Sequence, residues 1–127
     1  MSTEGKVKRH KTAIKRYELS APIKALIRDG LLDERKSVFD YGCGRGSDIR
    51  ILNRRGFQCS GWDPAFCPAK PKVESDIVNL GYVINVIEDP EERSETLAQA
   101  WELSRKLLVV SSLTPVSYTH LTLPTKA

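Results

Sequence analysis

Three glycines and two carboxylates make up the part of the sequence best suited to ligand chemistry. Gly42, Gly44 and Gly46 alternate with other residues after an apolar run that ends in Asp40, and Asp63 follows 23 residues after Asp40. Glycines between a strand and a helix let the backbone approach a ligand that a Cβ would block. The helix that follows offers free N–H groups to an anion. The separation of the two aspartates is typical of a second strand whose end carries a carboxylate to a ribose diol.

Three classes of ligand use such a loop, and the sequence distinguishes them. A P-loop needs a lysine after its glycines, but there is no lysine between Lys36 and Lys70. A dinucleotide fingerprint reads GxGxxG, whereas here Ser47 stands where the third glycine would be. S-adenosylmethionine has no phosphate, and its ribose, carboxylate and sulfonium suit an aspartate, free N–H groups and an acidic neighbourhood. The loop therefore favours S-adenosylmethionine; the alternative is a plain tight turn with a surface aspartate.

The segments VFDYGCGRG, GWDP and DIVNLGYVINVIEDP, with LLVVSS after them, resemble the class I S-adenosylmethionine-dependent methyltransferases. The resemblance implies an α/β fold: a truncated Rossmann-like domain whose mostly parallel sheet has about four strands and flanking helices. It also implies S-adenosylmethionine as cofactor and methyl transfer as activity. The positions that match the family's cofactor motifs are Asp40, Gly42, Gly44 and Gly46 in the loop, Asp63 at the ribose hydroxyls, and Leu80, Gly81 and Tyr82 at the strand end that faces the reactive methyl.

A narrower resemblance covers about residues 9–113. TAIKRYELSAP, DYGCGRGSD, GWDP and NLGYVINVIEDPEER are similar to the methyltransferase family associated with DNA phosphorothioation, which implies a link to DNA modification. Members of that family are longer than this chain, so we expect 20–115 to be a partial cofactor-binding domain. The resemblance identifies neither a catalytic residue nor the methyl acceptor. A domain that binds cofactor without catalysis, and a non-enzymatic module that binds nucleic acid or a protein partner, are the alternative functions.

The segment Asp63-Pro64-Ala65-Phe66 also resembles the DPPY/F motif of amino-methylating DNA methyltransferases. That motif belongs after the strand expected at 76–82, where a flipped amino group would reach the methyl. Here the segment follows the second strand and Ala65 replaces a proline, so we interpret it as the ribose corner.

Several side chains near the loop have two interpretations. Tyr41, Cys43 and Trp62 either line an adenine pocket or pack in the core. Tyr82 either stacks on an acceptor base or packs. Arg45 is either a cation of the cofactor loop or a solvated side chain.

Caps and apolar periodicity predict the helices that position these residues. Ser20 and Pro22 begin a helix that Gly30 ends. A second helix is expected at 47–55, after the glycine loop. Asp89 caps the third helix, with Arg105 and Lys106 expected at its end, where they would complement the helix dipole.

The strands are expected at 37–41, 57–62, 76–82 continuing through VINVI, and 107–112. Apolar runs such as LLVV are typical of strands covered on both faces, which favours a parallel sheet. Only twelve residues separate Asp63 from Asp76, so the further strand and two helices usual in this class do not fit there. The expected sheet order is second, first, third, fourth.

Charge is concentrated at the start of the chain. Residues 1–36 carry ten Lys and Arg against five Asp and Glu, and the remainder carries ten against eleven. Residues 1–19 read as a basic lead that could contact nucleic acid. No apolar run is long enough to span a membrane, and the lead lacks the apolar stretch of a signal peptide, so we expect a cytosolic protein without a membrane partner. The oligomeric state is left open.

The three cysteines form no CxxC pair, and the two histidines lie outside the central region, which argues against a metal centre and a histidine triad. The segment VSYTHLTLPT at 116–125 resembles the translated end of a transposon-derived sequencing adaptor. We therefore expect 116–127 to be a non-native tail and the edge of the strand at 107–112 to be unpaired.

Overall fold

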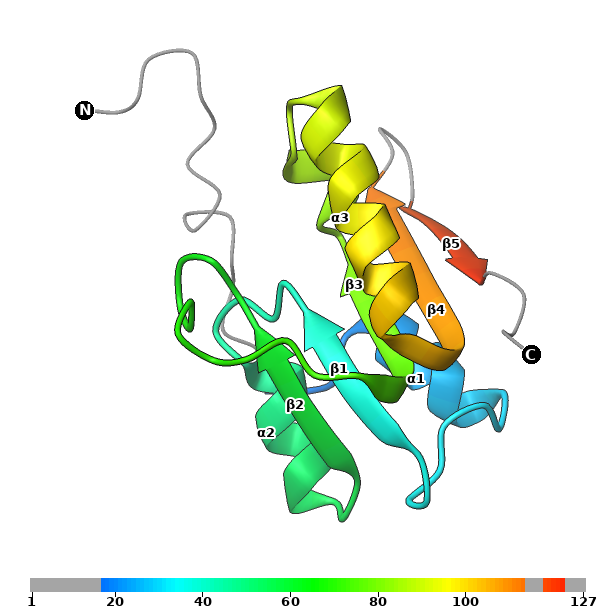
Figure 1. Ribbon diagram of the computed structural model, residues 1–127. Coiled ribbons are helices and arrows are strands. Elements are labelled where there is room, and N and C mark those ends of the chain that lie inside the picture. Colours follow the sequence, from blue (N-terminus) through cyan, green and yellow to red (C-terminus); the bar gives the residue numbers. More distant parts are fainter. Residues whose placement is uncertain (1–16, 114–117, 123–127) are drawn as a thin grey trace.

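A five-stranded sheet with the order β2-β1-β3-β4-β5 forms the centre of the fold (Figure 1). The structure is a computed structural model that describes residues 17–113 and 118–122. Strands β1 to β4 run parallel, which confirms the predicted fold class and strand order, and β5 runs antiparallel to β4. The strands are β1 (Ser37–Tyr41), β2 (Gln58–Trp62), β3 (Ser75–Gly81), β4 (Ser104–Leu113) and β5 (Tyr118–Thr122).

Helices cover both faces of the sheet (Figure 1). Helices α1 (Ala21–Arg28) and α2 (Ser47–Arg54) lie on one face, and α3 (Pro90–Leu103) lies on the other. Each helix begins where the sequence predicts. Ser20 is the N-cap of α1, and Asp89 is the N-cap of α3, where its carboxylate accepts the Glu91 N–H at 3.3 Å. The start of α3 needs only local signals, because the Asp89 cap satisfies one orphan N–H group and the N1 proline removes another. The Ser20 side chain makes no cap hydrogen bond at α1 and donates instead to Asp48 Oδ2 at 2.7 Å.

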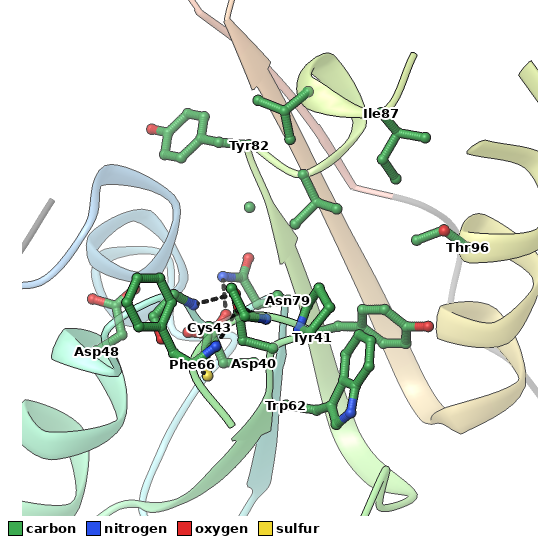
Figure 2. Close-up of a pocket in the computed structure, with 18 of the residues that line it drawn as sticks. Asp40, Tyr41, Cys43, Asp48, Trp62, Phe66, Asn79, Tyr82, Ile87 and Thr96 are labelled. Atoms are coloured by element: carbon green, nitrogen blue, oxygen red, sulfur yellow. Dashed lines mark hydrogen bonds between the residues drawn. The ribbon is translucent and has the colours of Figure 1, made fainter. Parts of the chain in front are cut away.

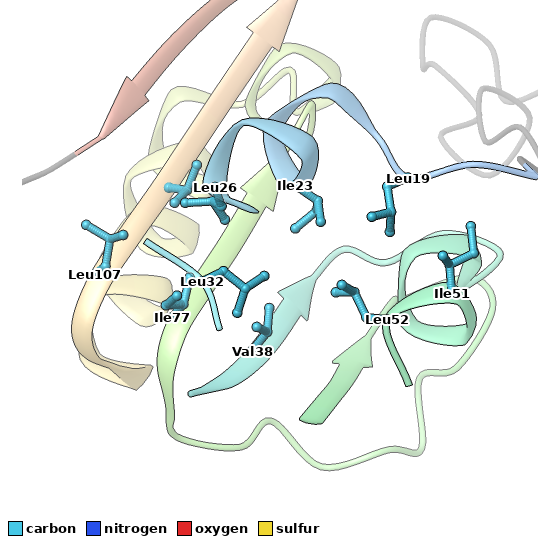
Figure 3. Packing of buried hydrophobic residues seen from close by; sticks show 10 residues of the cluster. Leu19, Ile23, Leu26, Leu32, Val38, Ile51, Leu52, Ile77 and Leu107 are labelled. Atoms are coloured by element: carbon cyan, nitrogen blue, oxygen red, sulfur yellow. The ribbon is translucent and has the colours of Figure 1, made fainter. Parts of the chain in front are cut away.

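Two apolar layers hold the helices to the sheet. Figure 3 shows the layer under α1 and α2, in which Ile23 and Leu26 of α1 meet Leu52 of α2 and Val38 and Ile77 of the sheet. The layer under α3 consists of sheet residues that face the opposite way, together with side chains of the helix: Phe39, Tyr41, Val78, Leu80, Ala100 and Leu108, with Leu97 and Trp101 packed against them. Alternate residues of β1 and β3 therefore enter opposite layers, as the pleat requires.

Strand β2 is one edge of the sheet, because a loop alone connects it to β3, as the short spacing predicted. The outer side of this edge is occupied by a side chain of α2. The Asn53 amide donates to the Cys59 carbonyl at 3.0 Å and accepts the Cys59 N–H at 2.9 Å. The Asn53 side chain thus makes the two hydrogen bonds that the backbone of one residue in a neighbouring strand would make.

Three expectations about boundaries were wrong. The third strand ends at Gly81 and does not continue through VINVI, because Tyr82 turns the chain and η2 (Ile84–Val86) follows. Arg105 and Lys106 belong to β4 and not to the end of α3, since pairing of Ser104 with Ser75 already starts the strand. The outer edge of β4 is not unpaired, because β5 pairs with it from Val109 to Leu113.

Residues 1–16 of the basic lead expected at 1–19 lie outside the described residues. Of the tail expected at 116–127, only β5 is described. No helix in the described part of the chain is long and apolar enough to cross a membrane.

Candidate cofactor site

A cavity of about 670 Å³ opens where the carboxyl ends of β1, β2 and β3 meet (Figure 2). This is the edge of a parallel sheet at which open α/β folds bind ligands, and the volume suits a nucleoside-sized molecule. Six of the eight predicted site residues line it: Asp40, Gly42, Gly44, Asp63, Gly81 and Tyr82.

The glycine loop is tied to the end of β2. The Trp62 carbonyl accepts the N–H groups of Gly42 at 2.7 Å and of Cys43 at 3.0 Å. Gly42 has φ +81°, and a Cβ there would lie 2.5 Å from Val83 Cγ2. Only glycine therefore fits both the left-handed backbone and the close approach to Val83.

Gly44 and Gly46 also have positive φ, but they face different spaces. Gly44 lines the cavity, whereas Gly46 is the N-cap of α2 and lines a second, smaller hollow behind the loop. The Gly46 N–H donates to the Cys43 carbonyl at 3.0 Å. The structure therefore places Gly46 in the turn that starts the helix and not on the wall of the main cavity.

Asp63 joins the glycine loop to the loop after β2. Its Oδ2 accepts the Gly44 N–H at 2.7 Å, and its Oδ1 accepts the N–H groups of Ala65 at 2.8 Å and of Phe66 at 3.1 Å. The side chain is buried, at 9% exposure. A carboxylate has about four acceptor positions, so three bonds leave room for a ligand hydroxyl. The DPAF segment is thus the corner after β2, as interpreted from the sequence.

Asn79 and Asp40 form the floor of the cavity between β3 and β1. The Asn79 Nδ2 group donates to Asp40 Oδ1 at 3.2 Å, and both residues are buried. Among the described residues, neither Asn79 Oδ1 nor Ser111 Oγ has a hydrogen-bond partner, although both atoms are buried. Such groups are rare and cost stability. Asn79 was not predicted as a site residue; its signal in the sequence is a lone amide inside the apolar run DIVNL.

The three residues predicted at the end of β3 have different surroundings. Leu80 is fully buried in the layer under α3, and its side chain does not line the cavity. Gly81 lines it, and a Cβ there would lie 3.1 Å from Asn79 Nδ2. Tyr82 also lines it, with φ +62°, and its N–H donates to the Ser111 carbonyl at 2.8 Å. A non-glycine residue in this region of φ is strained and is typical of functional sites.

An aromatic pair and a lysine form the side of the cavity next to α3. Tyr41 and Trp62 pack edge to face at 5.5 Å between centroids (Figure 2). The Lys72 ammonium lies 4.1 Å from the Trp62 centroid. Gln99 Oε1 of α3 accepts from Tyr41 Oη at 2.6 Å and from Lys72 Nζ at 2.9 Å. Tyr41 and Trp62 therefore do both things considered from the sequence: they pack in the layer under α3 and line the cavity.

The two cysteines beside the glycine loop are close together. Cys43 Sγ and Cys67 Sγ lie 3.4 Å apart, and both thiols are free. Desolvation by burial, together with the Cys67 thiol and nearby carboxylates, raises the pKa of the Cys43 thiol. Cys43 is therefore a protonated packing group at neutral pH. No group of three potential metal ligands occurs in the described part of the chain.

Three solved structures with a similar fold are methyltransferases. Magnesium protoporphyrin IX methyltransferase from Synechocystis PCC 6803, with bound S-adenosylmethionine, is 22% identical over 77% of this chain and 58% of its own, with a TM-score of 0.58. The 1,6-didemethyltoxoflavin N1-methyltransferase of Burkholderia thailandensis, with bound S-adenosylhomocysteine, is 18% identical over 79% and 56% of the two chains, also with a TM-score of 0.58.

A methyltransferase from Archaeoglobus fulgidus is 21% identical over 73% of this chain and 52% of its own, with a TM-score of 0.53. Neither a protein-family model nor a curated protein matches the sequence. The chain thus has a Rossmann-like methyltransferase fold and spans between 52% and 58% of the length of these three structures.

Proposed function

We propose that this chain binds S-adenosylmethionine in the 670 Å³ cavity and belongs to a protein that transfers the cofactor's methyl group to a component of DNA. The observation that carries the proposal is Asp63, a buried carboxylate at the end of β2 whose Oδ2 lies 2.7 Å from the Gly44 nitrogen. This arrangement joins the glycine loop and a ribose-binding acid in one cavity.

The residues on the walls suit the parts of the cofactor. Asp63 has acceptor capacity left for a ribose hydroxyl. Asp40 is a second buried carboxylate, in keeping with a cationic ligand. When bound, the cofactor supplies an electrophilic methyl on a sulfonium sulfur. The chain's own residues would hold the acceptor in line with this methyl and exclude water at the β3 end of the cavity.

The link to DNA modification rests on the sequence resemblance to the phosphorothioation-associated methyltransferases. The solved neighbours are longer than this chain, which spans between 52% and 58% of their length. A cofactor-binding chain that does not catalyse transfer and a non-enzymatic nucleic-acid module are therefore the two outcomes against which the proposal is tested.

Calorimetry with S-adenosylhomocysteine tests the cofactor site. We expect Asp63→Ala to weaken binding by about 1.5–3 kcal/mol, because a charged hydrogen-bond acceptor is lost. Asp63→Asn, which keeps an acceptor oxygen, should lose less. Asp76→Asn is the matched control, since Asp76 lies at the other end of the sheet beside Ser37. Unchanged affinity in Asp63→Ala, with a native circular dichroism spectrum, would refute the ribose role.

Transfer of a radiolabelled methyl group from S-adenosylmethionine to DNA tests the activity. Label in DNA supports methyl transfer, whereas cofactor binding without label identifies a binding-only chain. DNA binding without any affinity for the cofactor supports the non-enzymatic module.

A further inference from the structure

Positive and negative charges of the central chain lie in different parts of the fold. Residues 45–73, which form α2, β2 and the loop after it, carry six Lys and Arg against two Asp. Residues 74–113, which form β3, α3 and β4, carry three Lys and Arg against eight Asp and Glu. The net charges of the two parts nearly cancel in the sequence total, so the separation of charge is visible only once the helices and strands are placed.

Both carboxylates of the positive part are buried and accept hydrogen bonds from the chain itself. Asp48, at 2% exposure, accepts the Ser20 N–H at 2.8 Å and the Ser20 hydroxyl at 2.7 Å. Asp63 accepts three backbone N–H groups. The cations of this part are all exposed: Arg45, Arg50, Arg54, Arg55, Lys70 and Lys72. This surface therefore presents positive charge with no exposed carboxylate of its own.

Three of these six cations line the second hollow, which has a volume of about 470 Å³. Arg45, Arg50 and Lys70 line it, and no Asp or Glu is among its lining residues. Arg50 is held in place by hydrogen bonds to the Arg45 carbonyl at 3.0 Å and to Ser47 Oγ at 3.4 Å. Arg54 lies one helical turn further along α2 and extends the row. Within the described residues, no carboxylate pairs with these four cations.

An exposed aromatic ring lies at the rim of the hollow. Phe66 is 38% exposed, and the Arg45 guanidinium lies 5.1 Å from its ring centroid. Cys43, Gly44, Arg45 and Phe66 line both the hollow and the main cavity, so the two spaces share one wall. Cations that follow a groove beside an exposed ring are the combination by which proteins hold single-stranded nucleic acid.

We propose that α2, β2 and residues 63–70 form a surface for the phosphodiester backbone of single-stranded nucleic acid. The hollow receives a phosphate between Arg45, Arg50 and Lys70, and a base stacks on Phe66. This proposal deepens the proposed function, because it gives the nucleic acid a place beside the cofactor cavity. The positive charge of this surface is present whether or not the cavity binds the cofactor. The competing occupant is the acidic part of a second copy of the chain, which offers carboxylates but gives the Phe66 ring no flat base to stack on.

Fluorescence anisotropy with a labelled single-stranded 16-mer over a salt series tests the proposal. The test variant is Arg50→Gln/Arg54→Ala/Lys70→Ala in the full chain, which leaves every residue of the main cavity unchanged. We expect its affinity at low salt to fall by about tenfold or more, and its slope of log affinity against log salt to become shallower by about 2. Phe66→Ala should lower the oligonucleotide affinity at least about fivefold without changing the slope. Phe66→Trp, which keeps a large aromatic ring, should retain the affinity of the parent chain.

A charge-matched control separates this surface from general attraction. Arg28→Ala/Arg35→Ala/Lys106→Ala removes three exposed cations elsewhere, and all variants keep the same basic residues 1–16. An equal fall in the control, or no fall in the test variant, would overturn the proposal. Salt-dependent self-association in sedimentation velocity, without oligonucleotide binding, would assign the surface to a second copy. S-adenosylhomocysteine calorimetry on the Arg50→Gln/Arg54→Ala/Lys70→Ala variant and on the charge-matched control should be unchanged, so failure of cofactor binding is recognised separately.

Discussion

The two ends of the cavity differ in how completely the chain satisfies its own polar groups. At the glycine-loop end, the Trp62 carbonyl takes two N–H groups of the loop and the Asp63 carboxylate takes three more. At the β3 end, Asn79 Oδ1 and Ser111 Oγ are buried without partners within the described residues, and Tyr82 has a left-handed backbone.

The difference indicates which end is preorganised. A fully hydrogen-bonded loop keeps its shape without a ligand, so it can bind a constant group at low entropic cost. Strain and unpaired polar atoms instead cost stability where they occur, and they are retained where a site needs them. The glycine-loop end is therefore preorganised, whereas the β3 end carries backbone strain and unsatisfied polar atoms.

Gly42→Ala is expected to have the largest effect on this comparison. The substitution combines a left-handed backbone with a contact of 2.5 Å to Val83 Cγ2, so we expect a loss of about 2–4 kcal/mol in the free energy of unfolding. Urea denaturation measures the loss. Adding Val83→Ala to Gly42→Ala should recover the steric part.

Gly30→Ala is the control for the backbone alone. Gly30 has φ +75°, but nothing lies within 4 Å of the position of its Cβ, so we expect a loss of only about 1–2 kcal/mol. If Gly42→Ala and Gly30→Ala cost the same, the close packing of the loop on Val83 is not real.

Local signals decide how much of this fold the sequence could predict. Asp89 and the run at 37–41 gave correct elements, because a cap and a buried apolar run act within a few residues. Ser20 and Pro22 also marked the start of α1 correctly. The end of β3 could not be read from the apolar run VINVI, since a hydrogen bond from Tyr82 to distant Ser111 helps to fix the turn. The pairing of β5 with β4 is likewise non-local.

The candidate site divides in the same way. The glycines and Asp63 were found because their spacing along one strand, loop and helix reflects their positions in space. Asn79, Phe66 and the contact of Lys72 with Gln99 were missed, because each depends on which strands and loops become neighbours after folding.

Asp76→Asn should have an intermediate effect and tests the end of β3 away from the cavity. A hydrogen bond from the Ser37 N–H, aided by Lys106 and Arg105, holds the pKa of the Asp76 carboxyl below its ordinary value. Asp76 therefore stabilises the fold above that ordinary value, and the contribution disappears as the pH falls through the lowered pKa. We expect Asp76→Asn to lose about 1.5 kcal/mol at pH 7.

Urea denaturation at several pH values checks the Asp76 prediction. The difference between the free energies of unfolding of Asp76→Asn and the parent chain should shrink as the pH falls below the ordinary pKa of an aspartate. Affinity for S-adenosylhomocysteine should stay unchanged at pH 7. A drop in that affinity would show that the two ends of β3 are coupled.

The smallest expected effect concerns the strain at Tyr82. At ordinary positions, alanine is more stable than glycine; at φ +62° the order should reverse. We expect Tyr82→Gly to be more stable than Tyr82→Ala by about 1 kcal/mol in thermal or urea unfolding. The opposite order would show that the Tyr82 backbone is not strained.

The amide of Asn53 has a consequence for how this sheet can evolve. Because its two hydrogen bonds to Cys59 occupy the outer side of β2, another strand cannot pair there in register while Asn53 keeps this position. A descendant that inserted a strand and helices between β2 and β3 would first have to lose this one side chain. Asn53 thus prevents a further strand from being added beside β2, and the same amide limits unwanted pairing between chains.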